Sequence, residues 1–432
     1  MIAGGQAASG TMPEFIKTMQ RNIFYSPVLH WLAIATAVTT FPLIFLGGLV
    51  TSHRAGMSVP DWPNSYGYNM FLFPPNLWIG GIFYEHTHRL LGTLVGFCSI
   101  LLALRAWAPA GGARMARILR NTAVSCVILT LGAAVANLHQ IAVGFGSLAL
   151  ICIAALPFRS REPRRSVRWL TVAILGAVSI QGVLGGLRVV MVNLDLAIVH
   201  ACFAQAFFSL SAAAAVMTSR WWVDLAGGRK NLPLNAVSLR RAWVWGLTAV
   251  CLIYAQLIVG AVMRHEQAGL AIPDFPLNYG HILPPANAEE LHAANLSRLG
   301  DPKLDQQVTL RQIWVHFSHR LGAAAVSIGV VGLAIHLLLR HGRTLFLRRA
   351  AWMLLGLLAV QLALGMFTVW WRKPADLASA HVAVGALILV WAFIVTLRVW
   401  FLRRLNGVAA SSAQASAQSF NVMGSASGAA GL

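Results

Sequence analysis

The feature that most constrains this chain is a series of apolar runs, each long enough to cross a lipid bilayer. A helix needs about 20 apolar residues to cross the roughly 30 Å hydrocarbon layer. Such runs occupy residues 28–51, 85–107, 169–191, 197–218, 242–263, 313–339, 350–371 and 378–402. With 57% hydrophobic and 11% charged residues, the composition is too apolar for a soluble protein of 432 residues. We therefore predict an all-α polytopic membrane protein.

The charge distribution indicates how the chain sits in the membrane. The formal net charge is +20, with 33 Lys and Arg against 13 Asp and Glu. The arginines lie mostly in short loops between the apolar runs, which is the positive-inside bias of membrane proteins. The positive charge therefore reports topology and does not indicate a nucleic-acid partner. Because Lys17 and Arg21 precede the first run, we expect the N-terminus in the cytoplasm, and with an even number of spans the C-terminus too.

The stretch between Thr122 and Phe158 is almost continuously apolar and needs a separate interpretation. As one helix it would reach about 55 Å at about 1.5 Å per residue, too long for a single crossing. Arginine clusters flank it on both sides, and a single crossing would place one cluster outside. We therefore predict an inserted transmembrane hairpin at about 115–158 that turns near Asn137. The number of spans then becomes about ten.

An internal repeat divides the chain into two halves. The segment Ala55–Pro63 matches Ala268–Pro276, and Gln181–Gly185 matches Gln361–Gly365. An even number of inserted spans keeps both halves in one orientation, so the pseudo-twofold axis is expected along the membrane normal. Each half is then a four-helix bundle. The predicted division is a cytoplasmic tail (1–27), a first transmembrane half (28–218), a cytoplasmic linker (219–241), a second half (242–402) and a disordered cytoplasmic tail (403–432).

Four histidines occupy matching positions in the two halves. His88 and His319 each precede an arginine at the start of a span, and His200 and His381 lie a few residues into the last span of their half. An ionisable side chain in a membrane span is costly and indicates a function. Facing imidazoles on the helices of a bundle can hold heme iron. We predict the heme-ligand couples His88–His200 and His319–His381, the alternative being histidines that only hydrogen-bond neighbouring helices.

Charged residues beside these histidines are further candidates. Arg89 and Arg320, at the water boundary, are placed to contact heme propionates. Glu85 stands three residues before His88, on the same helical face, where a carboxylate could accept a proton. A structural alternative for Glu85 is a cap at the helix N-terminus. Its counterpart in the second half is His316, so the half with Glu85 is the better candidate for the reaction. His316 is either a partner of a heme-ligating histidine or simply a helix-start residue, and we favour the latter.

The remaining histidines are not expected to be ligands. His86 is predicted to lie off the face shared by Glu85 and His88 and to be solvated. The sequence has no GxGxxG fingerprint in a βαβ context and no P-loop. No nucleotide cofactor is therefore expected, and any electrons that the reaction needs would come from a partner.

These motifs together resemble the heme A synthase family. The likeness rests on the duplicated four-helix halves, the Pro-Asp-Trp-Pro outer loop, the Glu-x-x-His-Arg motif and the histidine in the fourth span of each half. It implies an oxidoreductase that converts heme O to heme A by successive hydroxylation of the C8 methyl group to a formyl group. It also implies heme b as cofactor. By motif, Glu85 would be catalytic, His88 and His200 would face the substrate heme, and His319 and His381 would ligate heme b.

The resemblance covers about residues 28–402, apart from the hairpin, which is extra to the family's usual eight spans. It implies the bacterial plasma membrane as location, and a heme O-forming farnesyltransferase and oxidase assembly factors as partners, with homo-oligomerisation left open. Two other classes stay open: a non-catalytic diheme protein that transfers electrons or carries heme, and a transporter with parallel repeats. Glu85, unmatched in the second half, favours catalysis, and a transporter does not need the paired histidines.

Overall fold

The computed structural model describes residues 24–107, 113–135, 162–228 and 236–428, with a few single positions between 145 and 152. Within these residues the regular structure is helical, apart from two isolated β-bridges in loops. Eight of the described helices are long and apolar enough to cross a membrane. They are α2 (Pro27–Ser52), α3 (Gly80–Trp107), α6 (Arg165–Val190), α7 (Leu194–Thr218), α9 (Ala236–His265), α11 (Leu310–His341), α12 (Leu345–Trp370) and α13 (Ala375–Gly428). The predicted all-α polytopic fold is confirmed, and each of the eight apolar runs coincides with one of these helices.

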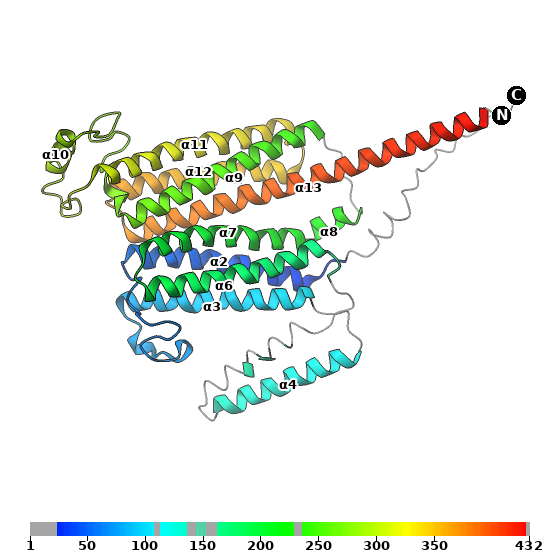
Figure 1. Ribbon diagram of the computed structural model, residues 1–432, viewed down its shortest axis with the longest axis horizontal. Coiled ribbons are helices and arrows are strands. Elements are labelled where there is room, and N and C mark those ends of the chain that lie inside the picture. The colour runs from blue at the N-terminus through cyan, green and yellow to red at the C-terminus, as the bar shows by residue number, and fades with distance from the viewer. Residues whose placement is uncertain are drawn as a thin grey trace.

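The eight helices form two four-helix bundles that lie side by side (Figure 1). In the first bundle, α2 and α6 each pack against α3 and α7; in the second, α9 and α12 each pack against α11 and α13. Between the bundles, α2 contacts α13, α7 contacts α9, and α7 contacts α13. In the repeat, α2 corresponds to α9 and α7 corresponds to α13. The contact of α2 with α13 is therefore equivalent to that of α9 with α7, as a pseudo-twofold relation requires. Both long outer loops lie at the same end of the molecule, so the two halves share one orientation (Figure 1).

The contact between the bundles combines an apolar cluster with polar contacts nearer the loops. Ile44 of α2, Phe208 of α7 and Ala386 of α13 belong to one buried cluster. Nearer the outer loops, the Arg264 side chain of α9 donates to the carbonyl oxygen of Gly48 in α2. Membrane helices associate through such close packing and interhelical hydrogen bonds, because lipid offers no hydrophobic driving force between them.

The predicted hairpin at 115–158 is described only in its first arm. This arm is helical, as α4 (Ala113–Val135), and it is drawn apart from both bundles (Figure 1). The turn near Asn137 and most of the second arm lie outside the described residues. The total of ten spans therefore stays a prediction beside the eight spans found among the described residues.

The C-terminal segment differs from the disordered tail that the sequence predicted. Helix α13 continues past its membrane segment to Gly428, so the chain after residue 403 is helical over most of its length. Extending an existing helix adds a hydrogen bond per residue without a new nucleation cost, and this Ala-rich segment contains no proline. In the predicted linker, α8 (Arg220–Ala226) packs against the middle of α13 through the stacked rings of Trp222 and Phe401.

Candidate functional site

The four candidate histidines lie at similar depth, near the end of the bundles that carries the outer loops. His88, His200, His319 and His381 fall between the seventh and tenth residues of α3, α7, α11 and α13 respectively. At about 1.5 Å per residue, positions three residues apart differ in depth by about 5 Å. All four side chains are half-buried. The similar depth predicted from the sequence is therefore present in the structure.

The second-half couple has a spacing that suits one metal ion. The ring centroids of His319 and His381 are 6.3 Å apart, with their planes at 66°. Two imidazole–metal bonds of about 2 Å, plus roughly 1 Å from each nitrogen to its ring centre, give about 6 Å. No group of three or more His, Cys, Asp or Glu among the described residues is arranged to hold a metal ion. Two nitrogens per site suit heme iron, because the porphyrin supplies the remaining ligands.

The first-half couple does not show this ring contact. His200 is close enough to act electrostatically on His88, but their rings make no contact like that of His319 and His381. The Nδ1 atoms of His88 and His200 are buried without a hydrogen-bond partner. Buried polar atoms are normally satisfied, so two unpartnered Nδ1 atoms at one site show that these two rings lack hydrogen-bonded support.

Each of the four histidine rings lies against a glycine of a neighbouring helix. A Cβ atom added to Gly47, Gly185, Gly260 or Gly365 would lie only 3.1–3.2 Å from Cε1 of His88, His200, His319 or His381, respectively. The four glycines occupy repeat-equivalent positions on α2, α6, α9 and α12. Sequence reasoning quoted two of them as repeat markers, but a residue without a side chain gave no sign of its contact. The glycines leave room for rings at fixed positions between helices, which fits a planar cofactor.

Substitution of one of these glycines should disturb the ring that it faces. We expect Gly365→Ala to change the absorbance and electron paramagnetic resonance spectra of heme in the second half, because His381 must move by a few tenths of an ångström. Gly356→Ala on the same helix is the matched control, since nothing lies within 4 Å of a Cβ there. Both changes raise helix propensity by about 1 kcal/mol, so propensity alone would affect them equally. Identical spectra for the two variants would contradict the assigned contact.

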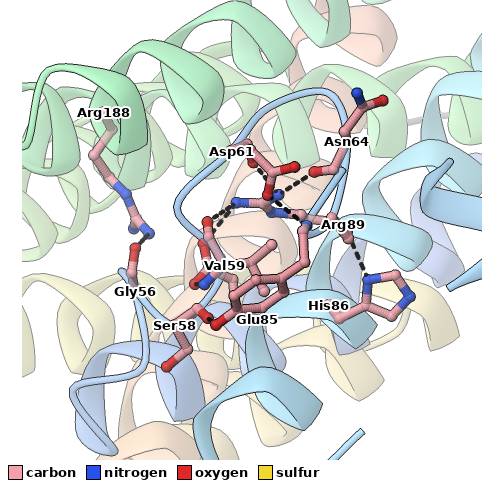
Figure 2. A network of polar contacts seen from close by, with 11 residues as sticks. Gly56, Ser58, Val59, Asp61, Asn64, Glu85, His86, Arg89 and Arg188 are labelled. Atoms are coloured by element: carbon pink, nitrogen blue, oxygen red, sulfur yellow. Dashed lines mark hydrogen bonds and ion pairs between the residues drawn. The ribbon is translucent and has the colours of Figure 1, made fainter. Parts of the chain in front are cut away.

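Glu85 is buried and holds the first outer loop (53–79) in place. Its carboxylate accepts hydrogen bonds from the Val59 N–H at 2.9 Å and from the Arg89 side chain at 3.0 Å. Arg89 also donates to the carbonyl oxygens of Val59, Asp61 and Asn64, as Figure 2 shows. Most of the hydrogen bonds of the Arg89 side chain therefore go to the first outer loop. Its contact with a heme propionate stays a prediction.

The second half repeats this network with a neutral ring in place of the carboxylate. His316 is buried, and its Nδ1 accepts from the Ile272 N–H at 3.2 Å. Arg320 donates to carbonyl oxygens of the second outer loop (266–309), including those of Ile272 and Asp274. The interpretation of His316 as a simple helix-start residue is wrong, because it anchors the loop as Glu85 does. The side chain at this position anchors the outer loop in both halves, and only in the first half is it a carboxylic acid.

The backbone of the two outer loops repeats the same turn. Each contains one cis X–Pro bond and passes through left-handed backbone at a Tyr-Gly pair. Gly67 and Gly280 both have φ +78°, a conformation that glycine adopts without steric cost. Asp61 accepts hydrogen bonds from both N–H groups of its Tyr-Gly pair, and Asp274 does the same in the other half. This detailed match supports the repeat deduced from the sequence.

The prediction that His86 is solvated is wrong. Its side chain is fully buried, its Nδ1 lies 3.1 Å from the Ser65 hydroxyl, and its ring packs against Phe73 and Trp78. The position does leave the face of Glu85, as expected, but the first outer loop folds back over it. Helical periodicity cannot report a loop that covers a helix from outside.

The first outer loop is also fixed to α6, next to the first couple. Trp62 lies so close to Gly186 that a Cβ there would overlap the indole ring. Two residues further on, Arg188 donates to the Gly56 carbonyl at 3.0 Å (Figure 2). Gly186 directly follows Gly185, which contacts His200. Sequence reasoning missed both contacts, since neither Gly186 nor Arg188 has a counterpart of the same type in the second half.

Fold and site together define a class of protein: a polytopic membrane protein with a duplicated four-helix bundle, whose facing histidines are suited to hold heme. A family profile described as "Cytochrome oxidase assembly protein" matches residues 80–393. The chain belongs to this family.

Several similar proteins are named heme A synthase. One from Rickettsia akari (strain Hartford) is 30% identical over 163 residues, covering 37% of this chain and 44% of that protein. One from Geobacillus kaustophilus is 24% identical over 358 residues, or 82% and 86% of the two chains. One from Caulobacter vibrioides is 23% identical over 417 residues, or 88% and 96%. The match thus spans less than half of the Rickettsia protein but most of the other two, and the predicted resemblance is confirmed.

Proposed function

We propose that this protein is a heme A synthase-type oxidoreductase that converts heme O to heme A, oxidising the C8 methyl group to a formyl group. The observation that carries the proposal is the 6.3 Å spacing of the His319 and His381 rings, each seated against a glycine. Family membership and the names of relatives that cover most of the chain support the same activity.

The two halves take different roles in this proposal. His319 and His381 hold a resident heme b, which when bound supplies one-electron redox chemistry. His88 and His200 face the substrate heme in this proposal, and their unpartnered Nδ1 atoms favour a heme that enters and leaves. The half at 28–218 is then the substrate half and the half at 242–402 the cofactor half.

Glu85 is the acid–base residue of the proposal. It lies one helical turn before His88, on the same face of α3. Its carboxylate is oriented by Val59 and Arg89, and lone pairs remain on it to accept a proton or position water. A fixed, buried carboxylate on this face of α3 could hold or transfer a proton during the reaction. Arg89 and Arg320 stay candidates for propionate contacts.

The protein spans a membrane, and we place it in the bacterial plasma membrane with both termini in the cytoplasm. The outer loops and the histidines would then lie near the external surface. A farnesyltransferase that forms heme O would supply the substrate, and oxidase assembly factors would receive the product. Self-association is compatible with the proposal but not needed by it.

Formation of heme A is the direct test. Co-expression with a heme O-forming enzyme, followed by chromatography of extracted hemes, should yield heme A, and the His88→Ala and His200→Ala variants should accumulate heme O instead. Extracts that contain only heme O, although the purified protein holds heme, would contradict the proposal.

A non-catalytic diheme protein is the second candidate. One observation favours it: His316 anchors the second outer loop without a carboxylate, so anchoring alone could explain Glu85. Such a protein would bind heme at both couples and transfer electrons without changing the heme. The same extraction experiment distinguishes the two candidates.

A further inference from the structure

The two histidine couples differ in what supports the ring nitrogen that faces away from a bound iron. In the second half, Nδ1 of His319 lies 3.0 Å from Nε2 of Gln256, and Nδ1 of His381 lies 3.2 Å from the Gln361 carbonyl oxygen. In the first half, Nδ1 of both His88 and His200 has no hydrogen-bond partner of normal geometry. The carbonyls of Leu43 and Gln181 lie near these two atoms without completing a hydrogen bond.

The difference is sharpest at His319 and traces to one pair of side chains. Gln256 stands four residues before Gly260, so its repeat counterpart is Leu43, four residues before Gly47. A leucine side chain cannot form a hydrogen bond. The Gln256 amide also donates to the backbone carbonyl of His319 at 2.7 Å, which ties it to the same residue by two contacts.

A second substitution makes room for this glutamine. A Cβ atom at Gly322 would overlap Oε1 of Gln256. Gly322 follows His319 by three residues, and the residue three after His88 is Leu91. The second half therefore has the pair Gln256 and Gly322 where the first half has Leu43 and Leu91. The glutamine and the glycine that accommodates it occur together, in one half only.

We infer that Gln256 is the positioning residue that makes the second-half couple retain its heme, whereas Leu43 leaves His88 able to release one. The inference rests on the proposed function, in that both couples take heme. A histidine that ligates iron through Nε2 carries a proton on Nδ1, and a partner that accepts this proton fixes the ring and raises its basicity. In the structure Nε2 of Gln256 faces Nδ1. A half-turn of the amide exchanges its two end atoms, which gives up the donation to the His319 carbonyl and lets Oε1 accept that proton.

The size of the expected change in heme retention can be taken from known metal sites. Removing the hydrogen-bond partner of a metal-ligating histidine costs about 10–100-fold in metal affinity. Gln256→Met keeps the length of the side chain and removes the hydrogen bond. We expect this variant to lose second-half heme about 10–100-fold faster than the unaltered protein, and its heme midpoint potential to rise, because the ring becomes a weaker donor.

The test uses purified full-length protein loaded with hemin, with apomyoglobin as the acceptor of released heme. The matched control is Gln205→Met, which removes another buried glutamine, one whose Oε1 has no hydrogen-bond partner. Faster transfer to apomyoglobin and a raised midpoint potential for Gln256→Met, but not for Gln205→Met, support the inference. Transfer rate and potential equal to those of the unaltered protein overturn it.

A reciprocal variant keeps the inference testable if Gln256→Met does not fold. Leu43→Gln with Leu91→Gly places the second-half pair beside His88 and leaves the second half unchanged. We expect first-half heme to leave about 10-fold more slowly, and an unchanged release rate overturns the inference. An unaltered protein that binds no hemin at all refutes the proposed function itself. Hemin binding with equal retention in both Gln256→Met and the unaltered protein refutes only the role of Gln256.

Discussion

Replacing His381 by alanine should remove the low-spin b-type heme spectrum of the purified protein. The His319 and His381 rings are 6.3 Å apart, the spacing that two ligands of one iron require, so loss of either leaves the iron with one protein ligand. Loss of an outer-shell partner alone costs about 10–100-fold in metal affinity, so loss of the ligand itself should exceed about 100-fold. Absorbance and electron paramagnetic resonance spectra of the variant measure this directly.

A histidine of the same helix bundle away from the couple provides the control. His336 lies on α11 more than four turns after His319, where its ring contacts His341. His336→Ala should therefore keep the low-spin spectrum, and His319→Ala should lose it as His381→Ala does. A normal spectrum in both His319→Ala and His381→Ala would remove the second couple as the site of heme b.

Glu85→Gln should leave heme binding intact and lower heme A formation by about 100-fold or more. A side chain that transfers protons in a reaction typically contributes 10²–10⁴-fold, and glutamine cannot accept a proton in its place. The amide oxygen of glutamine can still accept from the Val59 N–H, so the first outer loop should stay attached, although the ion pair with Arg89 is lost. Heme content and extracted heme A are the two measurements.

The matched control for Glu85→Gln lies in the other half. His316→Gln changes the repeat-equivalent residue, and its amide can likewise accept from the Ile272 N–H. Formation of heme A should then be nearly normal. If both variants lower heme A formation to the same extent, Glu85 acts through the loop and not through proton transfer.

Much of the architecture could be predicted from the sequence because a bilayer imposes a length on every helix that crosses it. The runs at 28–51 and 378–402, at the two ends of the core, both coincide with helices of the structure. The repeated segments Ala55–Pro63 and Ala268–Pro276 pointed to two like halves, and their loops adopt the same turn. The hairpin prediction could not be completed, since the turn near Asn137 lies outside the described residues.

The candidate site was predictable only in part. His319 and His381 were paired from their positions alone, and their ring centroids do lie 6.3 Å apart. Neither His86 nor His316 was placed correctly, because an outer loop folds back over both of them. The sequence did not indicate a role for Gln256. A glutamine in an apolar run can hydrogen-bond to many partners, and its actual partner depends on which helix packs beside it.

The sequence by itself determined which segments cross the membrane, that they form two like halves, and which residue types lie near one end of the bundles. Those properties follow from the length of each apolar run and from the position of a residue within it, and both can be read along the sequence. The tertiary structure decided how each helix is rotated about its axis, which glycine faces which ring, and which side chain reaches Nδ1 of His319. Rotation depends on close packing between helices that are far apart in the chain, so only the assembled bundle contains that information.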